Sequence, residues 1–319
     1  MIWLIGNRGM LGSDVEEMLK TRSVPYVASD ADIDITDYAM LRNFASSKEI
    51  DWIINCAAYT AVDKAEEERD KAYSINADGA HNIARVAKDS GATLIHVSTD
   101  YVFDGEKNGP YIEDDETNPL GVYGQSKRAG EERIMSAMDR YFIIRTAWLY
   151  GAEGNNFVRT MIRLFRERGE VRVVADQWGS PTYTKDLADT LISAASRASF
   201  RFGIYHFTNE GRTNWYDFAR EIYNQALRYG HVKREVNIIP ITTAEYPTKA
   251  RRPKNSYLSK EKIIRELGIE CRTWQKALEE YILTSPPDPL SHTLADCEPV
   301  CRGTGGSLGE GGSRSGNPD

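Results

Sequence analysis

The sequence has no excess of basic residues and no long apolar run. Its 40 Lys and Arg stand against 47 Asp and Glu, a formal net charge of −7. Because a nucleic-acid protein needs a strongly basic surface, this balance argues against a nucleic-acid partner. No apolar stretch approaches the roughly 20 residues that span a bilayer, and residues 1–5 meet a glycine loop too soon for a signal sequence. We therefore expect no membrane partner and a cytoplasmic location.

Cysteine is also scarce. The four cysteines, Cys56, Cys271, Cys297 and Cys301, are spaced in a way that matches no common metal or redox motif. We therefore expect neither a disulfide framework nor a metal site.

The composition, with 41% hydrophobic and 27% charged residues in a chain of 319, is typical of a globular protein. Over residues 1–150, short β-like runs alternate with stretches of helical periodicity. The predicted strands are 1–5, 24–28, 52–55, 93–98 and 141–146. The predicted helices are 13–20, 38–48, 70–90 and 127–138. This order predicts an α/β fold with a Rossmann-type, doubly wound parallel sheet that binds a dinucleotide.

The pattern loosens over residues 151–285, which we interpret as a smaller substrate-binding lobe. Helices are predicted at 156–167, 184–197, 215–229, 259–266 and 273–283, and β-like pieces at 171–174, 203–207 and 236–240. We expect part of this region to return to the first sheet. Residues 286–319 are rich in Pro, Gly and Ser and cannot bury enough apolar area to offset their ordering entropy. They are predicted to be a disordered, low-complexity tail.

A glycine-rich segment directly follows the first predicted strand. Gly6, Gly9 and Gly12 would set a tight turn that brings backbone amides and a helix N-terminus against a pyrophosphate. The alternative is a glycine turn without a ligand. Their spacing, three residues and then three, resembles that of the extended short-chain dehydrogenase/reductase superfamily.

Charged residues near this loop leave the choice of cofactor open. Asp30 follows the second predicted strand, where a carboxylate accepts hydrogen bonds from the adenosine ribose and favours NADH. Arg8, in the loop, would instead favour the 2′-phosphate of NADPH. Asp34 and Ile35 are placed to flank the adenine. The small residues before Tyr59, namely Ala57 and Ala58, would let the backbone approach the cofactor, although core packing explains them equally well.

A tyrosine and a lysine stand four residues apart, at the start of a predicted helix. This spacing places Tyr123 and Lys127 on one helix face. A cation beside the phenol lowers its pKa from about 10, so the tyrosine can donate a proton near neutral pH. The lysine can also hydrogen-bond the nicotinamide ribose. A core aromatic beside a solvated lysine is the alternative for an isolated match.

Hydroxyl side chains end the fourth predicted strand. One hydroxyl beside Tyr123 can orient a carbonyl oxygen and stabilise the charge that develops there. Strand alternation sends Ser98 and Thr99 to opposite faces, and we expect Thr99 to act.

Several longer segments resemble one family, dTDP-4-dehydrorhamnose reductase. The matching pieces include Ser98-Thr-Asp-Tyr-Val-Phe-Asp-Gly105, Val122-Tyr-Gly-Gln-Ser-Lys127, and the segments 57–66, 145–150, 154–157, 176–182 and 252–256. The resemblance implies NADPH- or NADH-dependent reduction of the 4-keto group of dTDP-4-dehydro-L-rhamnose, a nucleotide-sugar substrate. It also implies that Tyr123 is the proton donor and Lys127 its partner, that Thr99 and Asp100 contact the sugar, and that Trp148 packs on it. The cofactor contacts it implies are Gly9, Met10, Leu11, Asp30, Asp34, Ile35, Ala57, Ala58, Tyr59 and Val97.

Some members of that family dimerise around a magnesium ion held by glutamates. The corresponding positions here are Asp14 and Lys185. Because a lysine cannot ligate a hard cation as a carboxylate does, we expect at most a homodimer without that magnesium link.

The alternatives within the fold are nucleotide-sugar epimerases and 4,6-dehydratases, which share the glycines and the Tyr/Lys pair. A dehydratase usually carries Asp-Glu after the strand-end threonine, whereas this chain has Asp100-Tyr101. The alternative from another class is a catalytically silent regulatory subunit, because that of methionine adenosyltransferase is similar to this family.

Overall fold

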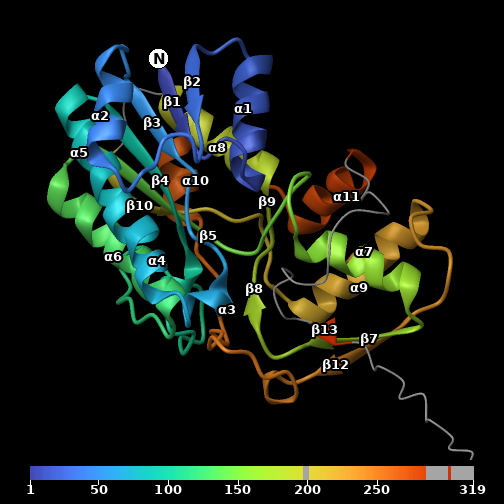
Figure 1. Ribbon diagram of the computed structural model, residues 1–319. Helices are drawn as coiled ribbons and strands as arrows, with labels where there is room; N and C mark the ends of the chain where they lie inside the picture. Colours follow the sequence, from blue (N-terminus) through green and yellow to red (C-terminus); the bar gives the residue numbers. More distant parts are fainter. Residues whose placement is uncertain (197–200, 285–300, 303–319) are drawn as a thin grey trace, which may run out of the picture.

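A six-stranded parallel sheet forms the centre of the larger part of the molecule, as the computed structural model in Figure 1 shows. The structure describes residues 1–196, 201–284 and 301–302. The strands are β1 (Ile2–Ile5), β2 (Tyr26–Ser29), β3 (Trp52–Asn55), β4 (Thr93–Thr99), β5 (Tyr141–Thr146) and β10 (Gly203–His206). Their order is β10-β5-β4-β3-β1-β2. The predicted α/β class with a doubly wound parallel sheet is confirmed.

Helices cover both faces of this sheet. One face packs against α1 (Met10–Thr21), α8 (Thr184–Ser196) and α10 (Glu261–Leu267). The other packs against α2 (Tyr38–Ser46), α5 (Ala80–Ser90) and α6 (Val122–Ala137). Because both faces are covered, every residue of β1 is buried, which explains its uninterrupted apolar sequence.

The single helix predicted over 70–90 is divided in the structure. It consists of α4 (Arg69–Tyr73), a π-helix (Ser74–Gly79) and α5. The widened turn contains Asn76, whose side chain hydrogen-bonds Tyr59 and Ser126. A short helix, α3 (Val62–Ala65), precedes α4.

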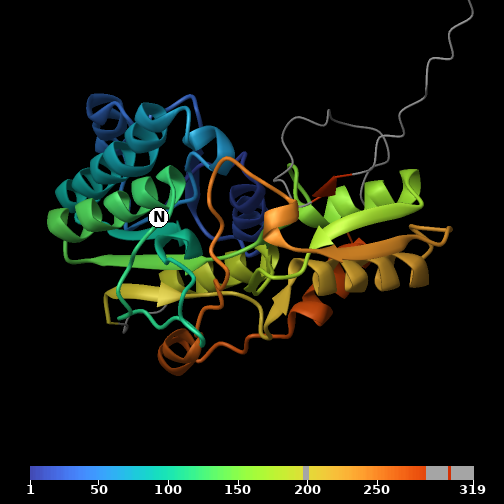
Figure 2. The same cartoon turned by 90° about the horizontal axis from the view of Figure 1, so that it is seen from below.

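The smaller part is a helical layer on a small sheet, and Figure 2 shows it beside the larger part. Its sheet has the order β12-β7-β13, from Asn237–Ile241, Glu170–Val174 and Cys301–Arg302. The helices α7 (Phe157–Glu167), α9 (Trp215–Arg228) and α11 (Trp274–Thr284) share one apolar core with it. The predicted tail otherwise lies outside the described residues.

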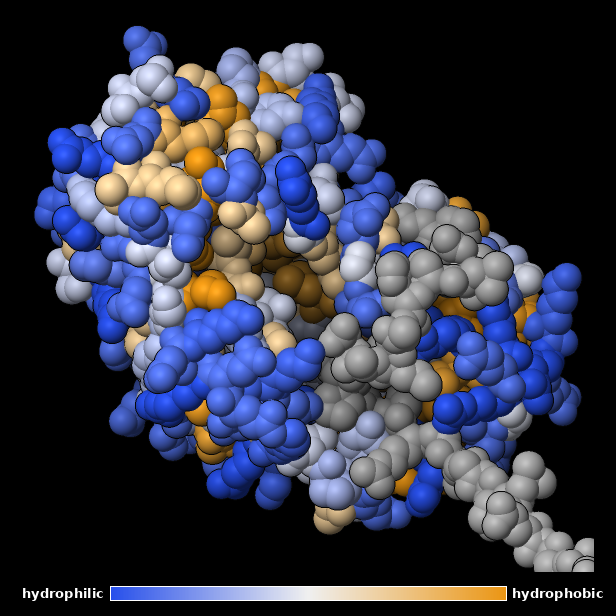
Figure 3. Space-filling view, viewed as in Figure 1, coloured by the Kyte–Doolittle hydropathy of each residue, from blue (hydrophilic) through white to orange (hydrophobic). Residues whose placement is uncertain are grey.

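Two short strand pairs and two 3₁₀ turns complete the elements of the described residues. The pairs are β6 (Leu149–Tyr150) with β9 (Thr182–Tyr183), and β8 (Trp178–Gly179) with β11 (Thr213–Asn214). The turns are Asp100–Val102 and Thr243–Glu245. The face seen in Figure 3 is hollowed where the two parts meet, and apolar side chains lie deep in the hollow.

No helix within the described ranges has the length and apolar character that crossing a bilayer requires.

Candidate active site

The glycine loop joins β1 to α1 and closes against the end of β3. Gly6 has φ +82°, and a Cβ there would lie 2.7 Å from the Ala57 nitrogen. A Cβ on Gly12 would lie 1.9 Å from the Gly6 oxygen. Gly9 is the N-cap of α1. Because no side chain caps this end of the helix, the first backbone amides of α1 remain available to a ligand. The loop therefore has the shape that a pyrophosphate at a helix N-terminus requires.

The two residues that follow Gly9 face different ways. The Met10 side chain points to the loop around Gly154, because a Cβ on that glycine would lie 3.7 Å from the Met10 methyl carbon. Leu11 is 6% exposed and belongs to the core beneath α1. Any contact of Leu11 with a cofactor is therefore a contact of its backbone.

Asp30 lies beside the glycine loop at the carboxyl end of β2. Its carboxylate accepts a hydrogen bond from the Arg8 backbone nitrogen at 3.0 Å, which holds it beside the loop. Asp34 instead accepts hydrogen bonds from the nitrogen and hydroxyl of Thr36, both at 2.8 Å, and stabilises its own turn. Ile35 is buried in the core with α2 and α5.

The segment after β3 is held by an asparagine of the π-helix. Ala57 and Ala58 are half-buried. The Tyr59 nitrogen donates to Asn76 Oδ1 at 2.8 Å, and Asn76 Nδ2 donates to the Tyr59 oxygen and to Ser126 Oγ, both at 3.0 Å. Asn76 thus ties the small-residue segment to α6, the helix that carries Tyr123.

Lys127 is 2% exposed and lies against β4. Its Nζ donates to the Val97 oxygen at 2.7 Å and lies 3.3 Å from His96 Nε2. Burial lowers the pKa of Lys127 to about 8, although the charges of Glu131 and Cys56 act to raise it. The amine can therefore gain or lose a proton near neutral pH.

Tyr123 lies in the first turn of α6, earlier than the predicted start of this helix at residue 127. The helix begins at Val122 because Glu66 Oε1 accepts a hydrogen bond from the Val122 nitrogen at 2.8 Å. The Tyr123 ring is half-buried and packs edge-on against Tyr101, with ring centroids 5.4 Å apart at 75°.

The two hydroxyls at the end of β4 face opposite sides of the strand. Ser98 Oγ donates to the buried Glu131 carboxylate at 2.6 Å. Thr99 Oγ1 donates to Asp100 Oδ1 at 3.0 Å and accepts a hydrogen bond from the Tyr101 nitrogen at 3.2 Å. Thr99 therefore holds Asp100 in place at the end of the strand.

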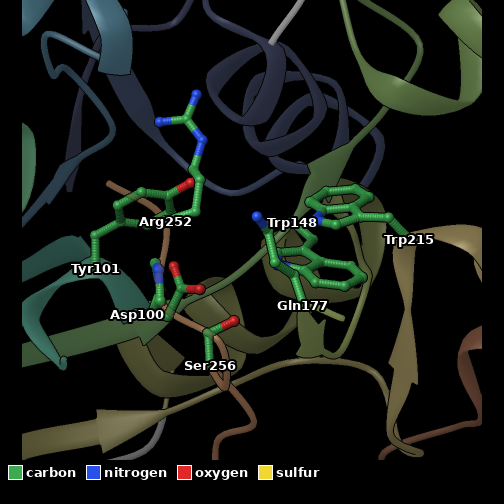
Figure 4. Close-up of a pocket in the computed structure, with 8 residues that line it drawn as sticks. Asp100, Tyr101, Trp148, Gln177, Trp215, Arg252 and Ser256 are labelled. Carbon is green, nitrogen blue, oxygen red and sulfur yellow. The ribbon is translucent and has the colours of Figure 1, made fainter. Parts of the chain in front are cut away.

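A pocket opens between the two parts of the molecule, and Figure 4 shows its lining. The lining residues are Asp100, Tyr101, Trp148, Gln177, Trp215, Arg252, Pro253 and Ser256. Trp148 has φ +50°, unusual for a residue other than glycine, and stacks on Trp215 with ring centroids 3.6 Å apart at 12°. Arg252 Nη2 donates to Asp63 Oδ2 at 3.0 Å. The pocket thus combines aromatic faces with a fixed positive charge.

The structure brings together only part of the predicted substrate set. Asp100 and Trp148 line the pocket, whereas Thr99 reaches it through Asp100. Six further lining residues were not predicted: Tyr101, Gln177, Trp215, Arg252, Pro253 and Ser256. Five of these six lie in the segments 98–105, 176–182 and 252–256, which carry the family resemblance and offered a signal. Trp215 offered none.

Comparison with known proteins identifies a family for nearly all of the described chain. The model of the RmlD substrate binding domain matches residues 1–285. The dTDP-4-dehydrorhamnose reductase of Aggregatibacter actinomycetemcomitans is 42% identical over 282 residues, covering 86% of this chain and 96% of the relative.

Solved structures agree with this match. That of a dTDP-4-dehydrorhamnose reductase from Clostridium acetobutylicum has a TM-score of 0.83 at 42% identity, covering 88% of this chain and 98% of the other. That of the Bacillus anthracis enzyme, in complex with NADP, has a TM-score of 0.82 at 39% identity with the same coverage.

Proposed function

The chain belongs to the dTDP-4-dehydrorhamnose reductase family, and we propose that it reduces the 4-keto group of dTDP-4-dehydro-L-rhamnose to dTDP-L-rhamnose with NADPH or NADH. The observation that carries this proposal is the position of the sugar pocket. Asp100 and Tyr101 line it, directly after Thr99, and Tyr101 packs on Tyr123. The proton donor and the sugar site therefore adjoin each other.

The residues present fit a nicotinamide dinucleotide. A Cβ would fill the loop at Gly6 and Gly12, and the start of α1 carries no side-chain cap. Asp30 lies beside this loop, ready to accept hydrogen bonds from ribose hydroxyls. When bound, the reduced nicotinamide supplies the hydride that the sugar carbonyl carbon accepts.

The side chains of this chain would then complete the reduction. Tyr123 donates its phenolic proton to the carbonyl oxygen as that oxygen becomes a hydroxyl. Lys127 adjusts the proton affinity of this phenol and hydrogen-bonds the nicotinamide ribose. Asp100 orients the sugar, and the stacked pair of Trp148 and Trp215 packs against its ring.

The position of Arg252 in the pocket favours a nucleotide-sugar substrate in particular. Its side chain is 7% exposed, lines the pocket and is anchored through one nitrogen by Asp63. A guanidinium held in this way is suited to the pyrophosphate that links the sugar to the nucleoside.

The test is to supply the purified chain with dTDP-4-keto-6-deoxy sugars and either cofactor, and to follow the cofactor absorbance. We expect stoichiometric oxidation of NADPH or NADH. An epimerase would recycle its bound cofactor, and a silent regulatory subunit would bind the cofactor without turnover. Either result would overturn the proposal.

Replacing Tyr123 with Phe tests the assignment of the proton donor. Loss of a general acid lowers kcat by about 10²- to 10⁴-fold, and the affinity for the cofactor should be retained. Tyr73→Phe is the matched control, because Tyr73 is a half-buried tyrosine in the same cluster as Tyr123. Near-parental turnover of Tyr123→Phe would refute its role.

We further propose that any homodimer forms without a shared magnesium ion. Asp14 is 5% exposed, and this burial raises the pKa of its carboxyl, although the positive charge of Lys185 acts to lower it. The proposed location is the cytoplasm, where nicotinamide cofactors and nucleotide sugars are available.

A further inference from the structure

Three buried polar side chains form a row behind the Tyr123 site. Asn55 ends β3, His96 lies in β4, and Lys127 lies in α6; they are 1%, 1% and 2% exposed. Asn55 and His96 occupy paired positions in the register of the two strands. Buried polar groups of this kind need defined hydrogen-bond partners, and the proposed reaction gives neither Asn55 nor His96 a role.

The orientation of the Asn55 amide follows from a backbone neighbour. The Ala57 nitrogen lies 3.0 Å from Asn55 Oδ1, and a backbone N–H can only donate. The oxygen of the amide must therefore face Ala57. Its NH₂ group then faces His96 Nδ1 at 2.9 Å, and because an amide NH₂ also only donates, Nδ1 must accept.

An accepting Nδ1 determines the tautomer of His96. A neutral imidazole whose Nδ1 accepts carries its proton on Nε2. An imidazolium would set two donors against each other at Nδ1, and burial lowers the pKa of His96 well below its ordinary value. The Nε2–H group points to Lys127 Nζ, 3.3 Å away.

A donor that faces Nζ disfavours the charged form of the lysine. An ammonium has donors only, and one of them is used by the Val97 oxygen at 2.7 Å. A neutral amine offers a lone pair that can accept from His96 Nε2–H. The other groups that act on Nζ are Glu131, one turn further along α6, and the Cys56 thiol after β3. Glu131 is itself paired with Arg145 of β5.

We propose that Asn55 and His96 are positioning residues: Asn55 holds His96 as the neutral Nε2–H tautomer, and that N–H stabilises the uncharged amine of Lys127. The row lets the lysine exchange its proton close to neutral pH although it is shielded from solvent. The consequence for turnover rests on the proposed function, whereas the tautomer and the charge of Lys127 do not.

The first experiment measures the imidazole tautomers by ¹⁵N NMR of the full chain from pH 6 to 9. His96 should show a protonated Nε2 and an unprotonated Nδ1 throughout. His206 is the internal control, because it is also buried but its Nδ1 lies 3.2 Å from the Tyr111 carbonyl oxygen, which only accepts. His206 should therefore show the opposite tautomer. His96→Phe and His206→Phe assign the signals.

The second experiment reverses the hydrogen bond with Asn55→Asp. A carboxylate would accept from both the Ala57 nitrogen and His96 Nδ1, so Nε2 would accept from a Lys127 ammonium. We expect the pKa of Lys127, followed by the ¹³C shift of its Cε, to rise by about 1 to 3, as next to an opposite charge. The basic limb of the kcat/KM profile should move to higher pH, because the tyrosine–lysine pair then keeps its protons longer.

Each outcome has a distinct meaning. An imidazolium or an Nδ1–H tautomer at His96, or an unchanged pKa of Lys127 in Asn55→Asp, would overturn the proposal. If Asn55→Asp does not fold, His96→Phe replaces it and should raise the pKa of Lys127 too, with His206→Phe as the variant that leaves it unchanged. Absence of turnover with every keto sugar, with the NMR results as expected, would refute only the proposed function.

Discussion

The buried ion pair between Glu131 and Arg145 gives the clearest prediction about the stability of the fold. Arg145 Nε and Nη2 donate to the two Glu131 oxygens at 2.9 and 2.8 Å, and the side chains are 1% and 0% exposed. Ser98 Oγ adds a third hydrogen bond at 2.6 Å. The pair joins α6, which carries Tyr123 and Lys127, to β5.

Removing one partner of this ion pair should lower the free energy of unfolding far more than removing both partners. In Arg145→Met the Glu131 carboxylate stays buried, with only Arg128 at 3.2 Å and Ser98 to compensate its charge. An uncompensated buried charge destabilises by about 3–5 kcal/mol. The double variant Glu131→Leu with Arg145→Met has no buried charge to compensate, so we expect it to cost about 0–2 kcal/mol.

The assay is a double-mutant cycle of urea unfolding, followed by tryptophan fluorescence at neutral pH. The coupling between the two sites should be several kcal/mol and favourable to the intact pair. The reasoning would be refuted if the free energies of unfolding lost in the two single variants added up, within about 0.5 kcal/mol, to the free energy lost in the double variant.

The same pair predicts how stability changes with pH. Burial alone would raise the pKa of Glu131, but the hydrogen bonds and charge of Arg145, with Ser98 and Arg128, hold it below its ordinary value. A carboxyl with a depressed folded-state pKa contributes stability that is present above its unfolded value and lost as the pH falls through the folded one. Acid should therefore destabilise the parent more than the double variant.

The central sheet could be predicted from the sequence because its strands are nearly continuous apolar runs between glycine or polar turns. The strands at Trp52–Asn55 and Tyr141–Thr146 have the predicted bounds. The π-helix could not be predicted in this way. It contains Asn76, whose Nδ2 donates to the Tyr59 oxygen and to Ser126 Oγ, and both partners are distant in the sequence.

The residues of the candidate site differ in the same way. The positions of residues within one motif, such as Thr99 and Asp100, could be predicted because strand alternation and the carboxyl edge of a parallel sheet determine them. Trp215 could not, because it reaches Trp148 only through the packing of the smaller part on the sheet. Likewise, nothing in the sequence spacing pairs Asn55 with His96; their contact comes from the register of β3 and β4.

The remaining predictions concern the cofactor loop and the sugar pocket. Gly12→Ala would place a Cβ 1.9 Å from a backbone oxygen of the same loop and should abolish cofactor binding, measured by fluorescence titration; Gly109→Ala, where a Cβ meets nothing within 4 Å, should bind normally. Asp30→Ser removes the carboxylate acceptor for the ribose and should raise the ratio of kcat/KM with NADPH to that with NADH by about 10- to 150-fold, since a hydrogen bond to a charged group contributes about 1.5–3 kcal/mol. An unchanged ratio would show that this carboxylate does not contact the ribose. Trp215→Ala removes the ring that stacks on Trp148 at 3.6 Å and should raise KM for the sugar nucleotide while leaving KM for the cofactor unchanged, because only the pocket loses an aromatic wall.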